Sequence, residues 1–293
     1  MPPLDLAAAL GVILIWAFNF IAGKVGVGQF PALFMMGLRF ALVAMLLSPF
    51  LFRPLQGRFY LIFALGVVFG CFHFGPLFYG LQGVDAGPAA IAIQLTVPFS
   101  ALLAFAIDRE RLSGWQIAGM VIAFAGVYLL AGGPAKRLSV PHFLLIVGAA
   151  FAWSLANVII RRIGPISPFQ LNAWVGAIAF PFLLAASALI EEGHQDALAT
   201  ADWRGWGAIA YMAIAASIIA YGVWYALIKK HAVNRIVPLM LLSPVLAVIL
   251  AILILDEPFS LRTAVGGCIT LSGVAMIQFL HRRSPQPENP GSS

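Results

Sequence analysis

Long apolar stretches follow one another along the whole chain, separated by short segments that carry Gly, Pro and charged residues. Each stretch is roughly 20 residues long, which is the length of helix that crosses a hydrocarbon core about 30 Å thick. The pattern predicts an all-α polytopic membrane protein with ten membrane-spanning helices. We place these spans at residues 4–23, 31–50, 59–81, 86–107, 114–132, 142–161, 168–190, 205–228, 233–255 and 262–280.

Polar and glycine positions of the first half recur in the second half in the same order. Near the start of each half, Trp16 and Asn19 have counterparts in Trp153 and Asn157. Later landmarks recur too, with identical spacing of 147 residues from the glutamate onward: Pro98, Glu110, Ser113, Gly119 and Gly126 correspond to Pro244, Glu257, Ser260, Gly266 and Gly273. This recurrence predicts two five-helix repeats, over residues 1–133 and 142–280. Because five is an odd number, two copies joined directly enter the membrane in opposite directions, which makes the repeat inverted.

The composition indicates the same class of protein. Hydrophobic residues make up 62% of the chain and charged residues 10%, with a mean hydropathy of +0.97, whereas soluble chains carry about 25% charged residues. The formal net charge of +6 does not indicate a nucleic-acid partner, because Lys and Arg lie in short connections between spans rather than in one patch. The partner that the composition predicts is the lipid bilayer.

The distribution of Lys and Arg predicts the orientation, because short cytoplasmic loops retain positive charge. With a cytoplasmic N-terminus, eleven of the 17 basic residues lie inside: Arg53, Arg58, Arg109, Arg111, Arg161, Arg162, Lys229, Lys230, Arg235, Arg282 and Arg283. Five lie outside: Lys24, Lys136, Arg137, Arg204 and Arg262. We therefore expect both termini in the cytoplasm. The polar, Pro-rich end of the chain, residues 281–293, is expected to be a disordered cytoplasmic tail.

Several short motifs carry a resemblance to a known family. They are residues 16–26 (WAFNFIAGKVG), residues 38–40 (LRF), the segment 98–110, and its second copy, which ends at 256–258 (DEP). With these motifs the whole chain resembles the EamA family of the drug/metabolite transporter superfamily, and within it looks most like the bacterial aromatic amino-acid exporters of the YddG type. The chain departs from the family pattern at Arg109, where a glycine usually precedes the glutamate.

The resemblance implies ten helices with cytoplasmic termini, a central cavity between the two repeats, and export of small metabolites across the bacterial inner membrane. Inverted repeats are a recurrent architecture of secondary transporters that work by alternating access. We therefore expect a secondary transporter that exports amino acids, including aromatic ones, and related metabolites. The alternative within the superfamily is an exporter of drug-like or nucleotide-derived metabolites, and a third is a membrane enzyme or receptor.

No motif indicates an enzyme. The sequence has no P-loop, HExxH or GxSxG motif and no carboxylate pair inside a span, and residues 26–28 (GVG) are expected to form a turn. We predict no catalytic residue, cofactor or metal site. Glu110 and Glu257 fall at span ends, where they are expected to cap or salt-bridge a connection.

Polar residues inside spans are the candidates for substrate binding, because an unpaired polar group is costly in hydrocarbon. Asn19 and Asn157 follow Trp16 and Trp153 by three or four residues, and these four residues are candidates for a cavity between the repeats. The alternative for the two asparagines is a bond that holds helices together. Both alternatives remain open at this point.

Arg39 lies about 13 Å into its span at a rise of 1.5 Å per residue. A charge at that depth suggests a functional site, and the cation could bind the carboxylate of an exported amino acid. The favoured alternative is a structural role, with the guanidinium bonded to carbonyls at the end of another helix.

Other candidates lie in spans three, four, eight and nine. His73 could couple export to protons, although a buried histidine with one hydrogen bond is the more common arrangement. Tyr79, Gln94 and Tyr221 are further cavity candidates, while Pro98 and Pro244 would bend their helices, either as gates or as static kinks. The glycines of spans five and ten, Gly119, Gly126, Gly266 and Gly273, predict close helix packing or the contact of a homodimer.

Overall fold

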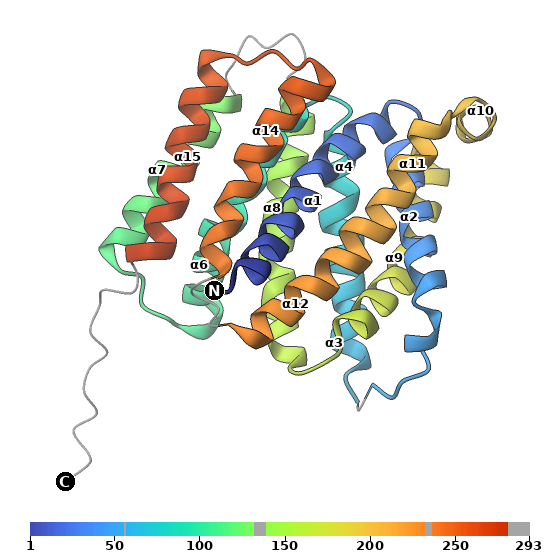
Figure 1. Ribbon diagram of the computed structural model, residues 1–293, viewed down its shortest axis with the longest axis horizontal. Coiled ribbons are helices and arrows are strands. Elements are labelled where there is room, and N and C mark those ends of the chain that lie inside the picture. The colour runs from blue at the N-terminus through green and yellow to red at the C-terminus, as the bar shows by residue number, and fades with distance from the viewer. Residues whose placement is uncertain (56, 132–138, 232–235, 281–293) are drawn as a thin grey trace.

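The structure is a computed structural model that describes residues 1–55, 57–131, 139–231 and 236–280. Every regular element in these ranges is helical (Figure 1). Helices of the first half are α1 (Pro3–Val27), α2 (Ala32–Leu46), η1 (Ser48–Phe50), α3 (Phe59–Leu65), η2 (Gly66–Phe74), α4 (Gly75–Gly80), α5 (Ala86–Ala92), η3 (Ile93–Leu95), α6 (Thr96–Asp108) and α7 (Gly114–Ala131).

Helices of the second half follow the same plan. They are α8 (Val140–Ile163), α9 (Pro168–Ile190), α10 (His194–Thr200), α11 (Trp203–Tyr211), η4 (Met212–Ile219), α12 (Ala220–Lys230), η5 (Val237–Leu241), α14 (Leu242–Leu255) and α15 (Leu261–Leu280). The elements α3, η2 and α4 run on as one continuous helical segment, and so do α5, η3 and α6, α11, η4 and α12, and η5 and α14.

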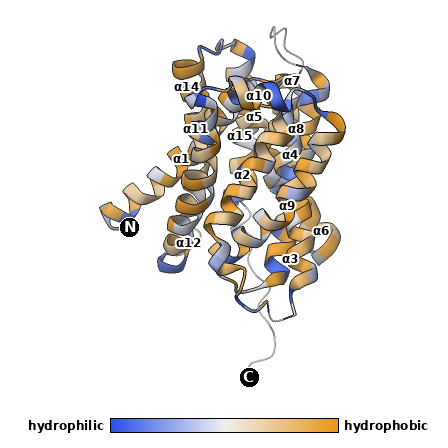
Figure 2. Cartoon of the chain, turned by 90° about the vertical axis from the view of Figure 1, so that its right-hand side faces the viewer, coloured by the Kyte–Doolittle hydropathy of each residue, from blue (hydrophilic) through white to orange (hydrophobic). Residues whose placement is uncertain are grey.

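Eight of these helical segments are long and apolar enough to cross a membrane, and two shorter apolar helices cover Ala32–Leu46 and Leu239–Leu255. Figure 2 shows apolar residues over the middle of the bundle and hydrophilic residues toward its ends. The protein is thus a multi-pass helical membrane protein. The disordered tail predicted for residues 281–293 lies outside the described residues.

The predicted span boundaries differ from the observed ones by at most four residues in the described ranges. The helix α1 continues to Val27, so the turn predicted at residues 26–28 is wrong for Gly26 and Val27. The missing side chain of Gly26 lets Met35 pack against the backbone of this last turn. The helix α2 ends at Leu46 because Pro49 disfavours helix in the residues before it. The short helix α10 was not predicted.

Each main contact between helices of the two halves has a counterpart in which the two repeats are interchanged. The most extensive contacts join α7 to α15 and α2 to α9, which occupy equivalent places in the two repeats. The contact of α1 with α14 is matched by that of α8 with α6, and the contact of α1 with η4 by that of α8 with η2. Figure 1 shows α7 beside α15 and α14 beside α1, although each pair is far apart in sequence.

Glycines make the contact between α7 and α15. The backbone of Gly119 lies against that of Gly273, and the backbone of Gly126 lies against that of Gly266. A methyl group on any of the four would overlap the facing backbone. The structure therefore assigns these glycines to close packing within one chain, and a homodimer through spans five and ten remains a prediction.

Irregular helix geometry also recurs at equivalent positions. The π-helical segments η2 and η4 lie in the third and eighth spans, and the 3₁₀ segments η3 and η5 precede Pro98 and Pro244. A proline lacks the N–H that the carbonyl four residues earlier would accept, so the preceding turn tightens. The following helices end in left-handed residues, Arg109 (φ 55°) and Asp256 (φ 52°).

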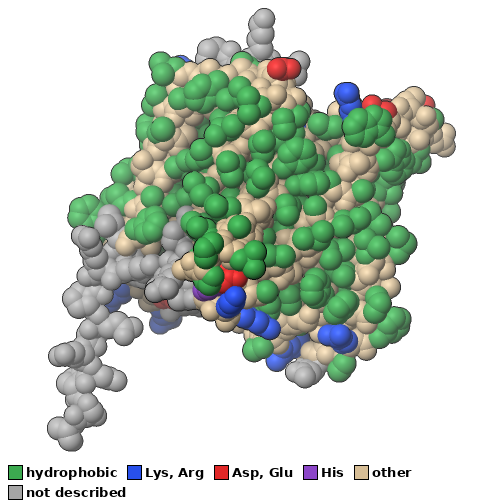
Figure 3. All heavy atoms as spheres, viewed as in Figure 1, with side chains coloured by type: hydrophobic (Ala, Val, Ile, Leu, Met, Phe, Trp, Pro, Cys, Tyr) green, Lys and Arg blue, Asp and Glu red, His purple; other side chains and the backbone are tan. Residues whose placement is uncertain are grey.

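Most of the basic side chains visible in Figure 3 lie toward one end of the bundle. In Figure 3 the Lys and Arg side chains lie mainly over the lower part of the molecule, and Figure 1 places the N-terminus and the last turn of α15 toward that end. There Asp5 of α1 accepts hydrogen bonds from Lys230 (3.0 Å) at the end of α12 and pairs with His231 (2.7 Å). This ion pair joins the first half of the chain to the second.

Candidate functional site

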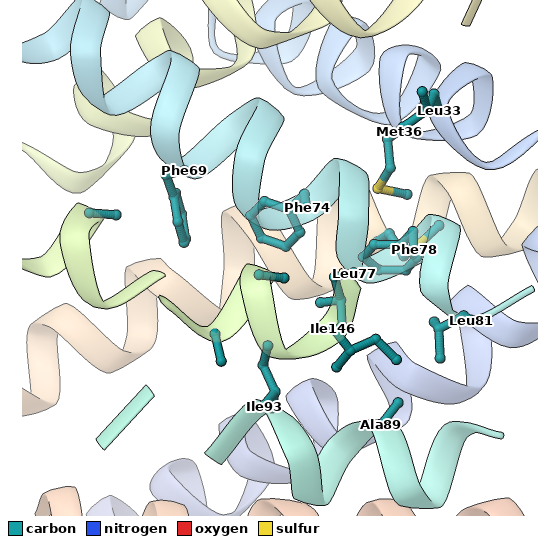
Figure 4. Packing of buried hydrophobic residues seen from close by; sticks show 14 of the residues in the cluster. Leu33, Met36, Phe69, Phe74, Leu77, Phe78, Leu81, Ala89, Ile93 and Ile146 are labelled. Atoms are coloured by element: carbon teal, nitrogen blue, oxygen red, sulfur yellow. The ribbon is translucent and has the colours of Figure 1, made fainter. Parts of the chain in front are cut away.

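Arg39 of α2 is the most deeply buried cation among the described residues, with 2% of its surface exposed. Its guanidinium carbon lies 4.4 Å from the ring centre of Phe74, 5.4 Å from that of Phe40 and 5.7 Å from that of Phe78. Figure 4 shows Phe74 and Phe78 in a row along η2 and α4, with Met36 of α2 beside them. The aromatic faces attract the cation and separate it from lipid.

Among the described residues, Arg39 has one oxygen acceptor. It is the hydroxyl of Ser217 in η4, which accepts from Nη2 at 3.0 Å. The Ser217 hydroxyl itself donates to the carbonyl of Met212 (2.8 Å), and the side chain of Asn172 donates to the Ser217 carbonyl (3.2 Å). The prediction that Arg39 bonds to carbonyls at the end of a helix is therefore wrong, because the acceptor is a side-chain hydroxyl. Arg39 instead joins the first half of the chain to the middle of the eighth span.

Trp16 of α1 lies against the same part of the second half. Its indole N–H donates to the carbonyl of Ala216 (3.2 Å), and its ring lies 5.3 Å from both Tyr221 and Trp224. Tyr221 follows Ser217, the hydrogen-bond partner of Arg39, by four residues. The structure thus brings together three predicted site residues, Trp16, Arg39 and Tyr221, around η4.

His73 and Trp153 form a second group, around η2. His73 is 2% exposed, its Nδ1 lies 2.9 Å from the carbonyl of Ala149, and its ring lies 4.9 Å from Trp153. Because a carbonyl can only accept, Nδ1 carries the proton and Nε2 does not when the ring is neutral. His73 is therefore the buried, singly bonded histidine that the sequence favoured. Phe74 contacts both the His73 ring (4.5 Å) and Arg39, so it joins the two groups.

The two prolines occupy equivalent places in the two repeats. Pro98 and Pro244 are both buried, each one turn after a 3₁₀ segment. Beside Pro98, the carbonyl of Thr96 accepts a hydrogen bond from Ser154 of α8 (2.8 Å). That bond joins the segment around Pro98 to the second half of the chain, and a gating or static role for the two prolines stays a prediction.

The remaining predicted residues lie apart or on neighbouring helices. Asn19 is half-buried on α1, and its Oδ1 is buried with no hydrogen-bond partner. Gln94 of η3 and Asn157 of α8 are half-buried on segments that pack against each other. Tyr79 lies near the far end of the bundle, where its ring stacks on His142 at 5.8 Å.

Pockets open to the surface lie on two sides of the third span in the described part of the chain. One of about 540 Å³ lies where Tyr79 and Gln82 meet the connections after α1 and α9, and Glu191 and Asp196 contribute to its lining. The other, of about 370 Å³, is apolar and lies between η2 and α8, with Phe72, Leu144 and Phe151 in its wall. Neither is lined by Trp16, Arg39 or Tyr221.

The carboxylates of two glutamates at span ends accept hydrogen bonds from backbone N–H groups at helix N-termini, which is a capping role rather than a role in proton relay. The carboxylate of Glu257 accepts hydrogen bonds from the backbone N–H of Ala86 (2.6 Å) and Gly87 (3.0 Å), at the start of α5. Glu191 accepts in the same way from Leu33 (3.0 Å) and Phe34 (3.1 Å) of α2. Burial raises the pKa of Glu257, and the two N–H groups oppose that rise. The predicted capping role of Glu257 is confirmed.

Sequence reasoning missed Ser217 and Trp224. Ser217 is a single hydroxyl in the apolar run MAIAASIIA, and it precedes Tyr221 by four residues. Residues four apart share one face of a helix, so the Tyr221 face could have revealed Ser217. Trp224 follows Tyr221 by three residues on the same face.

The comparisons with known proteins agree with this fold. The model of the EamA-like transporter family matches twice, at residues 4–132 and 141–279. The chain belongs to the EamA-like transporter family, and it is a membrane transporter with that family's two-repeat architecture.

Among individual proteins, the chain is 33% identical over 276 residues to the "Probable amino-acid metabolite efflux pump" of Salmonella typhimurium, covering 91% of this chain and 92% of that protein. It is 31% identical to the protein of the same name from Escherichia coli, covering 92% and 93%. A solved structure titled "Crystal structure of protein" matches with a TM-score of 0.63 at 21% identity, covering 95% of this chain and 98% of the other. That last likeness concerns the fold alone.

Proposed function

We propose that the protein exports amino acids, including aromatic ones, and related small metabolites across the bacterial inner membrane by alternating access. The two relatives of at least 31% identity are named as efflux pumps for amino-acid metabolites, and the match covers over nine-tenths of this chain. The moving units are the two five-helix halves, residues 1–133 and 142–280, crossing the membrane ten times with both termini in the cytoplasm. The basic end of the bundle is then the cytoplasmic end.

The observation that carries the mechanism is the exchange symmetry of the glycine contacts. Gly119 meets Gly273 and Gly126 meets Gly266, while Gly119 corresponds to Gly266 and Gly126 to Gly273. Exchanging the two halves maps each contact onto the other, and the two helices run antiparallel. These are the properties of an inverted repeat, which can rock between two equivalent arrangements around a site at its interface.

The aromatic groups around η4 favour a substrate with an apolar or aromatic side chain. Trp16, Tyr221 and Trp224 present rings and a hydroxyl at the interface of the halves, and such mixed surfaces bind amphipathic small molecules. A drug-like cation would need an anionic partner, whereas the buried charge in this region is Arg39. An amino acid therefore fits better than the alternative substrates.

The test is transport by the purified protein in proteoliposomes loaded with a panel of labelled amino acids. We expect exit of at least one amino acid, and Tyr221→Ala should reduce it while the melting temperature in detergent stays near that of the wild type. Absence of flux for every amino acid would contradict the substrate class. Labelling of single cysteines at the exposed residues 4 and 279 from opposite faces would contradict the proposed topology.

A further inference from the structure

Arg39 is a buried cation with spare hydrogen-bonding capacity. A guanidinium has five N–H donors. In the described part of the chain, Arg39 has one oxygen acceptor, the Ser217 hydroxyl, and a weak contact from Nη1 to the sulfur of Met36 at 3.8 Å, while Nε is buried without a partner. No carboxylate of the described residues pairs with it. The site is therefore short of acceptors and of negative charge.

The surrounding aromatic rings reduce the cost of burying the charge but do not replace an anion. Phe40, Phe74 and Phe78 offer ring faces to the guanidinium, and such faces attract a cation without accepting its in-plane N–H groups. A charge at membrane depth is expensive and is found where it has a partner or a function.

Elements of both halves surround the charge. Arg39 and its aromatic rings come from α2, η2 and α4, and Ser217 comes from η4 of the second half. Both π-helical segments border the site, and π-helical geometry is frequent at functional sites. The Arg39 to Ser217 bond is thus a link between two units that alternating access would move relative to each other.

We propose that Arg39 binds the carboxylate of the exported substrate, and that the Ser217 hydroxyl holds its place in the conformation described here. This proposal rests on the proposed function and specifies its substrate class, which is a carboxylate with an apolar or aromatic side chain. A carboxylate accepts two parallel hydrogen bonds from a guanidinium, so it satisfies donors that one hydroxyl leaves unmatched. By displacing Ser217, it opens the link between α2 and η4. The side chain of the substrate then lies toward Trp16, Tyr221 and Trp224.

The test compares an amino acid with its amide, which has a neutral group in place of the carboxylate. Both compounds are measured in proteoliposomes and as ligands that raise the melting temperature in detergent. The wild type should favour the acid. Arg39→Met keeps an unbranched side chain and removes the charge, and it should lower flux of the acid by about ten- to a hundredfold, the factor for a lost hydrogen bond to a charged group. Flux of the amide should change little.

Two further variants control for a structural role. Arg39→Lys retains the charge without the planar fork and should keep part of the preference for the acid. Ile178→Met changes the equivalent position of the second half and should leave the preference unchanged. Arg39→Met removes a buried charge that has no carboxylate partner among the described residues. The variant should therefore melt no lower than the wild type.

The outcomes separate the two proposals. If the wild type moves no amino acid, the proposed function fails and this inference fails with it. If the wild type moves amino acids and Arg39→Met still favours the acid, only the inference is overturned. It is also overturned if Arg39→Met melts at a lower temperature and loses acid and amide flux in equal proportion.

Discussion

Arg39 of α2 and Ile178 of α9 occupy equivalent places in the two halves, but they meet their neighbours by different means. The equivalence follows from Gly37 and Gly176, because each packs against the helix of the other half and Arg39 and Ile178 each follow two residues later. Arg39 bonds to Ser217 of η4. Ile178 packs against Gly66 of η2 by apolar contact alone and is 7% exposed.

The difference teaches that the fold does not require a charge at this position. An isoleucine on a glycine closes the interface in one half with dispersion and hydrophobic contacts. The first half places a cation, three aromatic rings and a hydroxyl at the matching position. An asymmetric polar feature in a symmetric frame is a better candidate for function than a polar feature that both halves repeat.

The largest expected effect comes from copying the arginine into the second half. Ile178→Arg places a charge in the buried apolar contact with Gly66 and should destabilise the protein by about 3–5 kcal/mol. Unfolding in SDS or by heat in detergent measures the loss. Stability equal to that of the wild type would show that either half tolerates an arginine, and the comparison would lose its force.

Removing the partner of Arg39 should cost less. Ser217→Ala deletes the one hydroxyl bonded to the guanidinium, and we expect a loss of about 1.5–3 kcal/mol, as for hydrogen bonds to charged groups. In the Arg39→Met background the same change should cost far less, because the charge is gone. Unfolding of both single variants and the double variant gives the coupling energy. Equal costs in the two backgrounds would mean that the bond contributes nothing.

The apolar interface should be sensitive to one added methyl group. Gly66→Ala would bring its new carbon against Ile178, so we expect about 1–3 kcal/mol of destabilisation. Gly148→Ala is the matched control, because nothing lies within 4 Å of the added carbon and alanine favours helix by up to about 1 kcal/mol. Melting temperatures in detergent should therefore move in opposite directions, and a parallel shift would contradict the packing described here.

The smallest expected effect concerns the helix ends after α6 and α14. Arg109 (φ 55°) and Asp256 (φ 52°) both adopt the left-handed conformation that glycine prefers. Arg109→Gly and Asp256→Gly should each stabilise the protein by about 0.5–1 kcal/mol. The melting temperature is the measurement, and a decrease for either variant would indicate a side-chain contact that outweighs the backbone strain.

Much of the fold followed from the order of residues. Apolar stretches located the helices within four residues, because a helix in lipid must be apolar over its whole length. Recurring glycines and prolines revealed the repeat before any contact was known. Arg109 adopts a left-handed backbone conformation, as Asp256 does at the equivalent turn of the second half.

The candidate site was predicted only in part. Trp16, Arg39, His73 and Tyr221 were found because polar and aromatic groups inside apolar stretches are conspicuous. The sequence did not show that Phe74 lies between Arg39 and His73, or that Tyr79 belongs to a pocket at another end of the bundle. Those facts depend on rotation of helices about their axes, which an apolar composition on all faces leaves undetermined.

The sequence by itself determined that this chain crosses the membrane many times and contains one unit twice, because hydrophobic length and recurring landmarks are properties of order along the chain. Only the tertiary structure decided that the glycines of α7 pack against those of α15, and that Arg39 donates a hydrogen bond to Ser217 rather than to a carboxylate or to the carbonyls at a helix end. The hydroxyl that accepts from Arg39 comes from a helix 178 residues away in the sequence. That choice of partner is set by how the two halves dock, which no local pattern specifies.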